Sequence, residues 1–220
     1  MMMIKKILFI AIVIVFSSCV NTETENYPNG RIKSEIHKQG DKYEGISRWW
    51  YDNGNLKMEV NYKDNKVDGY SRRWFYNGKI ESEEFYVADK RNGVSRLWNS
   101  IGNKISEENY VNDTLDGAYR LWYNKGQIKI EGGFKKGMYN GKWTWWNEMG
   151  VKVGEADFVD GSGVQVGWFL NGNKKREVHY KNNIKNGKEI IYSSNGDIEK
   201  VIINENGIVV SEKNIDIISK

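Results

Sequence analysis

Cysteine, proline and histidine are scarce in this sequence: the 220 residues include one cysteine, one proline and two histidines. The single cysteine, Cys19, excludes an intramolecular disulfide framework. The two histidines, His37 and His179, lie far apart in the sequence, and no Gly-x-Ser-x-Gly elbow is present. We therefore expect both histidines to be exposed strand residues, and we expect no enzymatic activity, no cofactor and no metal site.

Neither sign of charge dominates. The chain has 33 Lys and Arg against 29 Asp and Glu, a net charge of +4. Removing Lys5 and Lys6 with the first 19 residues leaves 31 against 29, a net charge of +2. Nucleic-acid binding usually shows as a basic patch or stripe, so we expect no nucleic-acid partner.

The longest apolar run is short. Ile7 to Phe16 follows two lysines, and a bilayer span takes ~20 apolar residues. The run ends in two serines and Cys19, which resembles a bacterial lipoprotein signal, in which the cysteine is diacylated and becomes the mature N-terminus. We expect residues 1–19 to be a lipoprotein signal peptide, Cys19 to be lipidated, and the protein to be anchored to the cell envelope (at the outer membrane if the cell has one). The alternative is an ordinary secretory signal with an incidental cysteine.

Glycine, in contrast, is abundant and periodic. A turn glycine recurs at Gly30, Gly54, Gly78, Gly102, Gly126, Gly150, Gly172 and Gly196, every 24 residues except for one step of 22. A second series keeps the same period and the same contraction: Gly45, Gly69, Gly93, Gly117, Gly141, Gly163 and Gly187. A fixed period in this range indicates an array in which each unit is one supersecondary element.

Each unit is predicted to be a hairpin. Asn53–Gly54, between aromatic and β-branched runs, favours a type I′ turn. Arg48 then faces Glu59, and Trp50 faces Lys57. The same register pairs Arg72 with Glu83, Arg96 with Glu107, and Arg120 with Glu131. A glutamate column could supply paired carboxylates for glycoside chemistry, but the facing arginines favour structural ion pairs, each worth about 0.2–1 kcal/mol when exposed.

In this register an aromatic residue faces each of the first six glycines of the second series, Gly45 to Gly163: Tyr62, Tyr86, Tyr110, Phe134, Phe158 and Tyr180. A ring lying over a cross-strand glycine pins the register. The last pair, Gly163 with Tyr180, keeps the same register after the 22-residue step. The contraction is therefore predicted to lie between hairpins.

Tryptophans form a column five residues after each of these glycines: Trp50, Trp74, Trp98, Trp122, Trp146 and Trp168. Strand alternation places them on the face of the arginines and glutamates, where packing between neighbouring hairpins explains them. Neither face is a clean apolar stripe, whereas strands covered by helices are nearly continuously apolar. We predict an all-β fold, an elongated single-layer antiparallel meander of stacked hairpins about 24 residues long.

The expected organisation is a signal peptide over residues 1–19, a polar tether over 20–26, hairpin repeats over 27–192 and a degenerate C-terminal capping hairpin over 193–220. The inter-repeat aspartates lack the spacing of a calcium loop and are expected to form turns. They are Asp64, Asp68, Asp113 and Asp116.

The pattern Gly45, Arg48, Trp50-Tyr51, Gly54, Glu59, Tyr62 resembles the MORN repeat variant, and the resemblance covers roughly residues 27–192. It implies the hairpin fold. Bacterial proteins of this type are often called YwqK family antitoxins, after a presumed role in neutralising a cognate toxin, so the resemblance implies a toxin as one form of partner.

Some aromatic residues are not required by the repeat. Tyr119, Trp143 and Trp145 lie on the face opposite the tryptophan column, and Trp and Tyr are favoured interface anchors. The candidate binding surface is therefore Tyr119, Leu121, Trp143, Trp145 and Trp146. We interpret the chain as an envelope-tethered scaffold for an unknown protein partner, with an antitoxin or immunity role as one form. The alternative is a glycan- or cell-wall-binding surface, because exposed Trp and Tyr stack on sugar faces.

Overall fold

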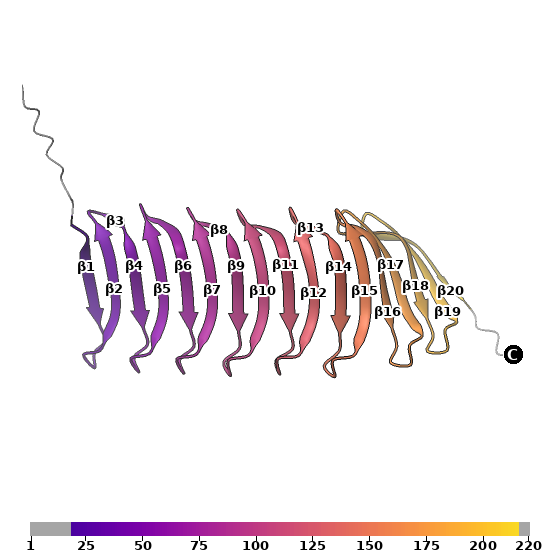
Figure 1. The fold of residues 1–220 in the computed structure, drawn as a ribbon, viewed down its shortest axis with the longest axis horizontal. Helices are drawn as coiled ribbons and strands as arrows, with labels where there is room; N and C mark the ends of the chain where they lie inside the picture. Colours follow the sequence, from indigo (N-terminus) through magenta and orange to yellow (C-terminus); the bar gives the residue numbers. More distant parts are fainter. Residues whose placement is uncertain (1–18, 216–220) are drawn as a thin grey trace, which may run out of the picture.

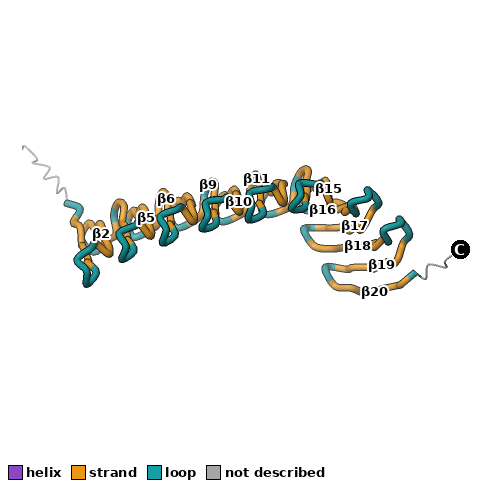
Figure 2. Tube along the Cα trace, turned by 90° about the horizontal axis from the view of Figure 1, so that it is seen from below, coloured by secondary structure: helices purple, strands orange, loops and turns teal. Residues whose placement is uncertain are grey.

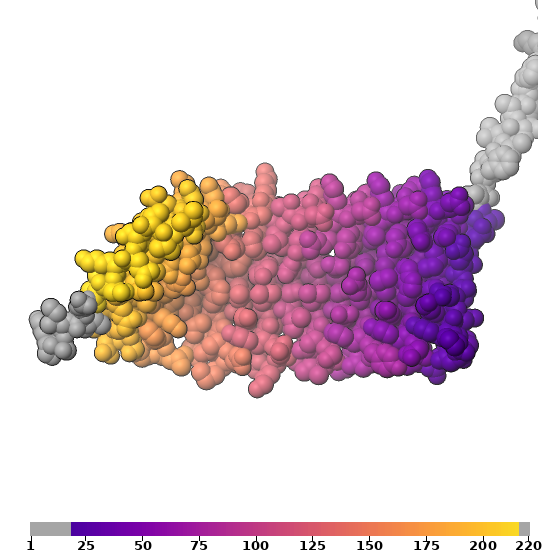
Figure 3. All heavy atoms as spheres, turned by 180° about the vertical axis from the view of Figure 1, so that it is seen from behind, coloured from indigo at the N-terminus to yellow at the C-terminus, as the bar shows by residue number. Residues whose placement is uncertain are grey.

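Residues 19–215 are described in the computed structural model, where they form a single open antiparallel sheet. Figure 1 shows the strands side by side in chain order, and Figure 3 shows one continuous slab from behind. Within residues 19–215 there are twenty strands and no helix, hence none that could cross a membrane. The predicted fold class is confirmed. The expected signal peptide, apart from Cys19, lies outside the described residues.

The strands are short and follow one another without crossovers. They are β1 Asn21–Asn26, β2 Ile32–Gln39, β3 Lys42–Tyr43, β4 Gly45–Trp50, β5 Leu56–Lys63, β6 Lys66–Trp74, β7 Ile80–Val87, β8 Lys90–Arg91, β9 Gly93–Trp98, β10 Lys104–Val111, β11 Thr114–Trp122, β12 Ile128–Lys135, β13 Met138–Tyr139, β14 Gly141–Trp146, β15 Lys152–Val159, β16 Ser162–Trp168, β17 Lys174–Lys181, β18 Ile184–Tyr192, β19 Ile198–Glu205 and β20 Ile208–Asn214.

The repeat hairpin has the predicted register but a different turn. Arg48 pairs with Glu59, as expected. Gly54 donates to the carbonyl of Tyr51 at 2.9 Å and has φ +92°, whereas Asn53 has no positive φ. This is a type I turn followed by a left-handed glycine. The extra residue shifts the register, so Trp50 pairs with Leu56 and not with Lys57.

The turns with two left-handed residues lie at the opposite end of the hairpins. Asp64 and Asn65 have φ of 51° and 68° between β5 and β6, the conformation of a type I′ turn. Asp113 occupies an equivalent turn, so it and Asp64 are turn formers as predicted. Asp68 and Asp116 lie instead within β6 and β11, where their carboxylates accept backbone N–H groups of the next turn.

All six predicted glycine–aromatic pairs are present, but the reason for glycine differs at most of them. Gly69 pairs with Tyr86 and has φ +114°, at a bulge opposite β5. A Cβ there would lie 2.5 Å from the Asn61 amide nitrogen, and no atom of Tyr86 is among its nearest neighbours. Backbone conformation, more than the covering ring, therefore requires glycine at this position.

The two-residue contraction lies between hairpins, as predicted, and it removes this bulge. β15 and β16 pair without a register shift, Phe158 opposite Gly163. Beyond them the sheet changes direction, and Figure 2 shows β17 to β20 curling away from the straight run. Asn183, in the β17–β18 turn, reaches across this bend: its amide donates to the carbonyl of Gly137 and accepts from the N–H of Tyr139, both at 2.8 Å.

Side-chain bonds to backbone link several of the turns to the next repeat. The hydroxyl of Tyr51 donates to the carbonyl of Trp74 at 2.8 Å, and the amide of Asn53 donates to that of Tyr76 at 2.9 Å. Tyr27 and Tyr123 make the same bond to Trp50 and Trp146. The tyrosine of the repeat thus joins neighbouring hairpins.

The predicted ion pairs form a continuous ladder, because Glu59, Glu83 and Glu107 each lie between two arginines. Glu59 pairs with Arg48 at 2.8 Å and with Arg72 at 3.4 Å, on the strands to either side. The alternation continues through Glu83, Arg96, Glu107 and Arg120 to Glu131. Lys104 is a third cation at Glu107, and these contacts lower the pKa of Glu107 to about 2.

The expected polar tether is wrong, because residues 21–26 form strand β1, antiparallel to β2. Glu23 and Glu25 reach across to Lys38 and Lys33, each at 2.8 Å, and these cross-strand pairs favour an edge strand. At the other end β19 and β20 form a hairpin within the expected capping segment, and every residue of β20 is exposed. Residues 216–220 lie outside the described residues.

The ladder predicts a position-dependent cost of losing a carboxylate. Glu107→Gln should lower the free energy of unfolding by about 1–3 kcal/mol at pH 7, because three cations lose their partner. The folded-state pKa lies below the unfolded value of about 4.3. The stabilisation is therefore present above pH ~4.5 and lost as the pH falls toward ~2, so the mutant and wild-type stabilities should converge there. Urea unfolding followed by circular dichroism measures this.

Glu155→Gln is the matched control, since this glutamate occupies the same column but, among residues 19–215, pairs only with Lys152 and is more exposed. It should cost less than about 1 kcal/mol. Equal losses at the two positions would contradict the ladder.

Candidate functional site

At one position of the 24-residue repeat, that of Ser47, large aromatic residues occur only in the middle of the sheet. Ser47, Ser71 and Ser95 occupy it in earlier hairpins, opposite Val60, Glu84 and Glu108. Tyr119 and Trp143 replace the serines, and they face Gly132 and Ala156. A larger residue on one strand is thus matched by a smaller one on its partner, which keeps the sheet surface filled without overlap.

The burial of Trp143 depends on these small residues on the neighbouring strands. Its indole is 3% exposed and covers Gly132, where a Cβ would lie 2.1 Å from the ring. Its Nε1–H donates to the carbonyl of Gly133 at 3.1 Å. Together with Ala156 and Phe158 it forms the buried cluster of this region.

Half-buried rings surround the cluster and line a cavity of about 170 Å³. We call this the aromatic bay. Its lining is Tyr119, Ile130, Phe134, Tyr139, Trp143, Trp145, Phe158, Gln165 and Tyr180.

The bay lies on the inner side of the bend. Tyr139 and Tyr180 are on β13 and β17, about 14 Å apart on a flat sheet at ~4.8 Å per strand. Their ring centroids are 6.5 Å apart, and Phe158 lies between them at 5.2 and 5.7 Å. The curl of the C-terminal strands (Figure 2) therefore closes the bay at one end.

The charges around the bay are unevenly placed. Burial raises the pKa of Tyr119, and the negative charge of Glu108 adds to this. Burial also raises the pKa of Tyr180, but the nearby Arg176 acts in the opposite direction. Arg176 is itself paired with Glu189, a 4% exposed carboxylate. Tyr119 and Tyr180 are therefore neutral hydrogen-bonding groups at physiological pH.

The structure brings together three of the five residues of the predicted surface. Tyr119, Trp143 and Trp145 line the bay, although Trp143 is its floor and not an exposed anchor. Leu121 pairs with Ile130 but does not line the cavity. Trp146 follows Trp145 in β14 and belongs to the tryptophan column, where its carbonyl accepts a bond from Tyr123.

Sequence reasoning missed the other rings of the bay. The sequence pattern indicates only a register-setting role for Phe134, Phe158 and Tyr180, and it does not single out Tyr139. The signal that could have revealed them is the coincidence of glycine at 132, alanine at 156 and the shortened connection before Gly163.

The tryptophan column is half-buried throughout and partly covered by the chain's own cations. The ammonium of Lys104 lies 5.1 Å from the centre of the Trp122 ring, and that of Lys152 lies 5.2 Å from Trp168. These contacts support the packing interpretation of the column.

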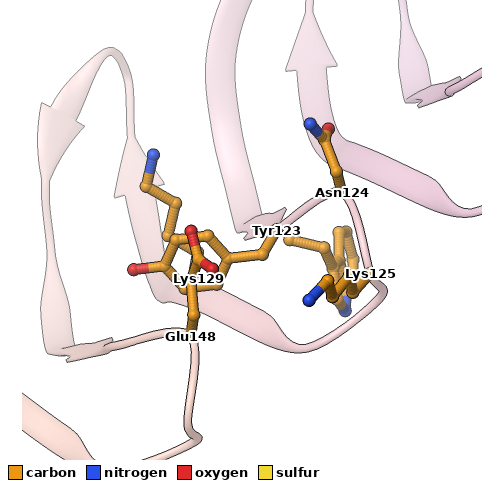
Figure 4. A pocket seen from close by; sticks show the side chains of 6 residues that line it. Tyr123, Asn124, Lys125, Lys129 and Glu148 are labelled. Carbon is orange, nitrogen blue, oxygen red and sulfur yellow. The ribbon is translucent and has the colours of Figure 1, made fainter.

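A larger hollow of about 330 Å³ lies between neighbouring turns (Figure 4). Trp122, Tyr123, Asn124, Lys125, Lys129 and Glu148 line it. Lys129 lies over the Tyr123 ring, whose hydroxyl makes the repeat-to-repeat bond described above. A hollow of about 420 Å³ at Tyr27 and Tyr51 repeats the arrangement, so such gaps are a consequence of stacking and not a specialised site.

The histidines are strand residues but half-buried, which corrects the expectation of exposure. His179 lies 3.6 Å from Glu177, and the Nδ1 of His37 is buried without a hydrogen-bond partner. Within residues 19–215 no group of His, Cys, Asp and Glu could hold a metal ion.

Comparison with known families gives one match. The model of the MORN repeat variant matches residues 43–64, 67–88, 115–136 and 162–182. A search of curated proteins finds no match. Trp143, Trp145 and Phe158 fall between the third and fourth matched segments.

The large-for-small exchange predicts a strong coupling between Gly132 and Trp143. Gly132→Ala should cost about 1–3 kcal/mol, because its methyl group overlaps the indole. In a Trp143→Ser background, which restores the residue of the regular repeats, the same change should cost less than about 0.5 kcal/mol. A double-mutant cycle from urea unfolding measures the coupling, and equal costs in both backgrounds would show that the contact is unimportant.

Proposed function

We propose that this chain, a protein built of MORN-variant repeats, is a non-enzymatic, envelope-tethered binding protein that holds a partner protein through the aromatic bay. The observation that supports it is the bay itself. The earlier hairpins keep serine at this repeat position, whereas here two strands exchange large and small residues, and the sheet bends around the result.

The size and the lining of the bay favour a side chain of a protein as the occupant. Pockets for small-molecule ligands usually measure about 300–1,000 Å³, and this cavity measures about 170 Å³. Rigid aromatic residues around a small pocket are typical of interface anchor sites. An antitoxin or immunity role is one form of this function, in which the partner is a toxin.

Glycan binding is the second candidate, and one observation favours it. The indoles of Trp143 and Trp145 are stacked at 26°, with centroids 5.9 Å apart. Trp145 is half-buried, so part of its surface remains open to a sugar ring. Most other ring pairs of the bay meet edge to face, however, and this arrangement leaves few flat faces for stacking.

Tethering is proposed to occur through Cys19. Its side chain is exposed, two residues before β1. A lipid on this residue would hold the N-terminal edge of the sheet near the membrane. The bay, on β11 to β17, lies many strands further along the sheet (Figure 1), which leaves it accessible to a partner.

Two conservative variants test the bay. Tyr119→Ser and Trp145→Leu install the residues that other hairpins carry at these positions, Ser95 and Leu97. Crosslinking of the tagged protein in intact cells, followed by mass spectrometry, should show the yield of the crosslinked partner reduced about tenfold or more, as for a hot spot worth at least ~1.4 kcal/mol.

Trp49→Leu is the matched control, because it makes the same change at the same repeat position outside the bay. It should leave the yield unchanged. Retention of the partner by both bay variants would refute the proposal. Retention of the protein on peptidoglycan or polysaccharide, lost in Trp145→Leu, would favour the glycan alternative.

The anchor is tested separately. Cys19→Ala should abolish incorporation of an alkyne-labelled fatty acid and move the protein from the membrane to the soluble fraction, because one residue carries the whole attachment. Val20→Ala should change neither readout. Labelling that persists in Cys19→Ala would rule out lipidation at this residue.

A further inference from the structure

At several places outside the bay the chain covers an aromatic ring with one of its own cations. The guanidinium carbon of Arg91 lies 3.9 Å from the Tyr110 centroid, and that of Arg72 lies 4.2 Å from Tyr70. Among the described residues, no lysine or arginine lies over a ring of the bay. Where a ring face of the bay is open, it is therefore available to a cation from outside.

A carboxylate without an ion-pair partner lies beside these rings. Glu108 is half-buried and directly opposite Tyr119 in the β10–β11 pair. It accepts a hydrogen bond from the hydroxyl of Tyr110. No lysine or arginine nitrogen within residues 19–215 lies within 4 Å of it, in contrast to Glu107, which has three such partners.

The other end of the bay already has its charges paired. Arg176 lies near Tyr180 and is bound to Glu189, which Lys185 also contacts at 2.9 Å. A cation entering the bay would be repelled at this end and attracted at the Tyr119 end. A bound cation is therefore expected at the Tyr119 end of the bay.

We propose that the anchor group in the bay is the side chain of a lysine or arginine of the partner protein, with its aliphatic stem against the rings and its cationic head at Glu108. This inference rests on the proposed function and adds the chemistry of the contact. A half-buried carboxylate and a set of uncovered rings are together complementary to a cation that carries N–H donors.

Hydrogen bonding favours such a side chain over a quaternary ammonium group, such as that of a choline lipid. A quaternary ammonium could lie on the rings, but it has no N–H to donate to Glu108. A lysine or arginine satisfies both features. The amine and guanidinium should therefore bind better than tetramethylammonium.

Small probes test the inference without knowledge of the partner. The full mature chain, labelled with ¹⁵N, is titrated with n-butylguanidinium, n-butylammonium, tetramethylammonium and the neutral 1-pentanol, and the indole N–H signals are followed by NMR. Trp145→Leu assigns the signal of Trp145. The guanidinium and ammonium probes should shift this signal, with affinity reduced at least threefold in Glu108→Gln and lost in Tyr119→Ser.

Glu84→Gln is the matched control, because Glu84 occupies the same repeat position one hairpin earlier, outside the bay. It should leave the affinity unchanged. Binding of 1-pentanol as strongly as the cations would overturn the inference, and so would stronger binding of tetramethylammonium or the absence of any binding. None of these outcomes decides the proposed function, which fails only if the bay variants retain the crosslinked partner.

Discussion

A sheet that is one layer thick has no second layer against which to bury a face, and the rest of this structure follows from that constraint. Among the described residues only six hydrophobic side chains are buried. Stability must come from contacts between neighbouring hairpins, as in other repeat arrays. The alternating ion-pair ladder and the tyrosine and asparagine bonds between turns supply these contacts, and each crosses from one repeat to the next.

The register was predictable because it follows from the period and from charge pairing, both visible in the residues. Arg48 opposite Glu59 and Gly163 opposite Tyr180 are present as expected. The errors occur at single-residue bulges, which depend on backbone angles that residue type does not determine. Strand alternation alone would place Lys104, three residues before Glu107, on the opposite face, but a register shift before Ser106 turns it toward Glu107. The tether was misjudged for a related reason, since the cross-strand partners of its glutamates lie on β2.

The site was predictable only in part. Tyr119, Trp143 and Trp145 stand out because the repeat does not require them. Phe134 and Phe158 do not stand out, since the same positions elsewhere hold aromatic residues with no such role. A bend in the sheet brings these rings together, and the bend coincides with the absence of a bulge between β15 and β16. The sequence shows the two missing residues, but the direction in which the sheet then curls is a property of the backbone.

A repeat array allows one unit to change without disturbing the others, because each hairpin contacts only its neighbours. Replacing serine by Trp143 needs a compensation only on the adjacent strands, at Gly132 and Ala156. Departures from the repeat can therefore accumulate where a partner binds, while the ladder maintains the sheet. The same reasoning applies to charge: every glutamate of the ladder has at least one arginine partner, so a half-buried carboxylate left without one, as at Glu108, has a place for a cation that the chain itself does not supply.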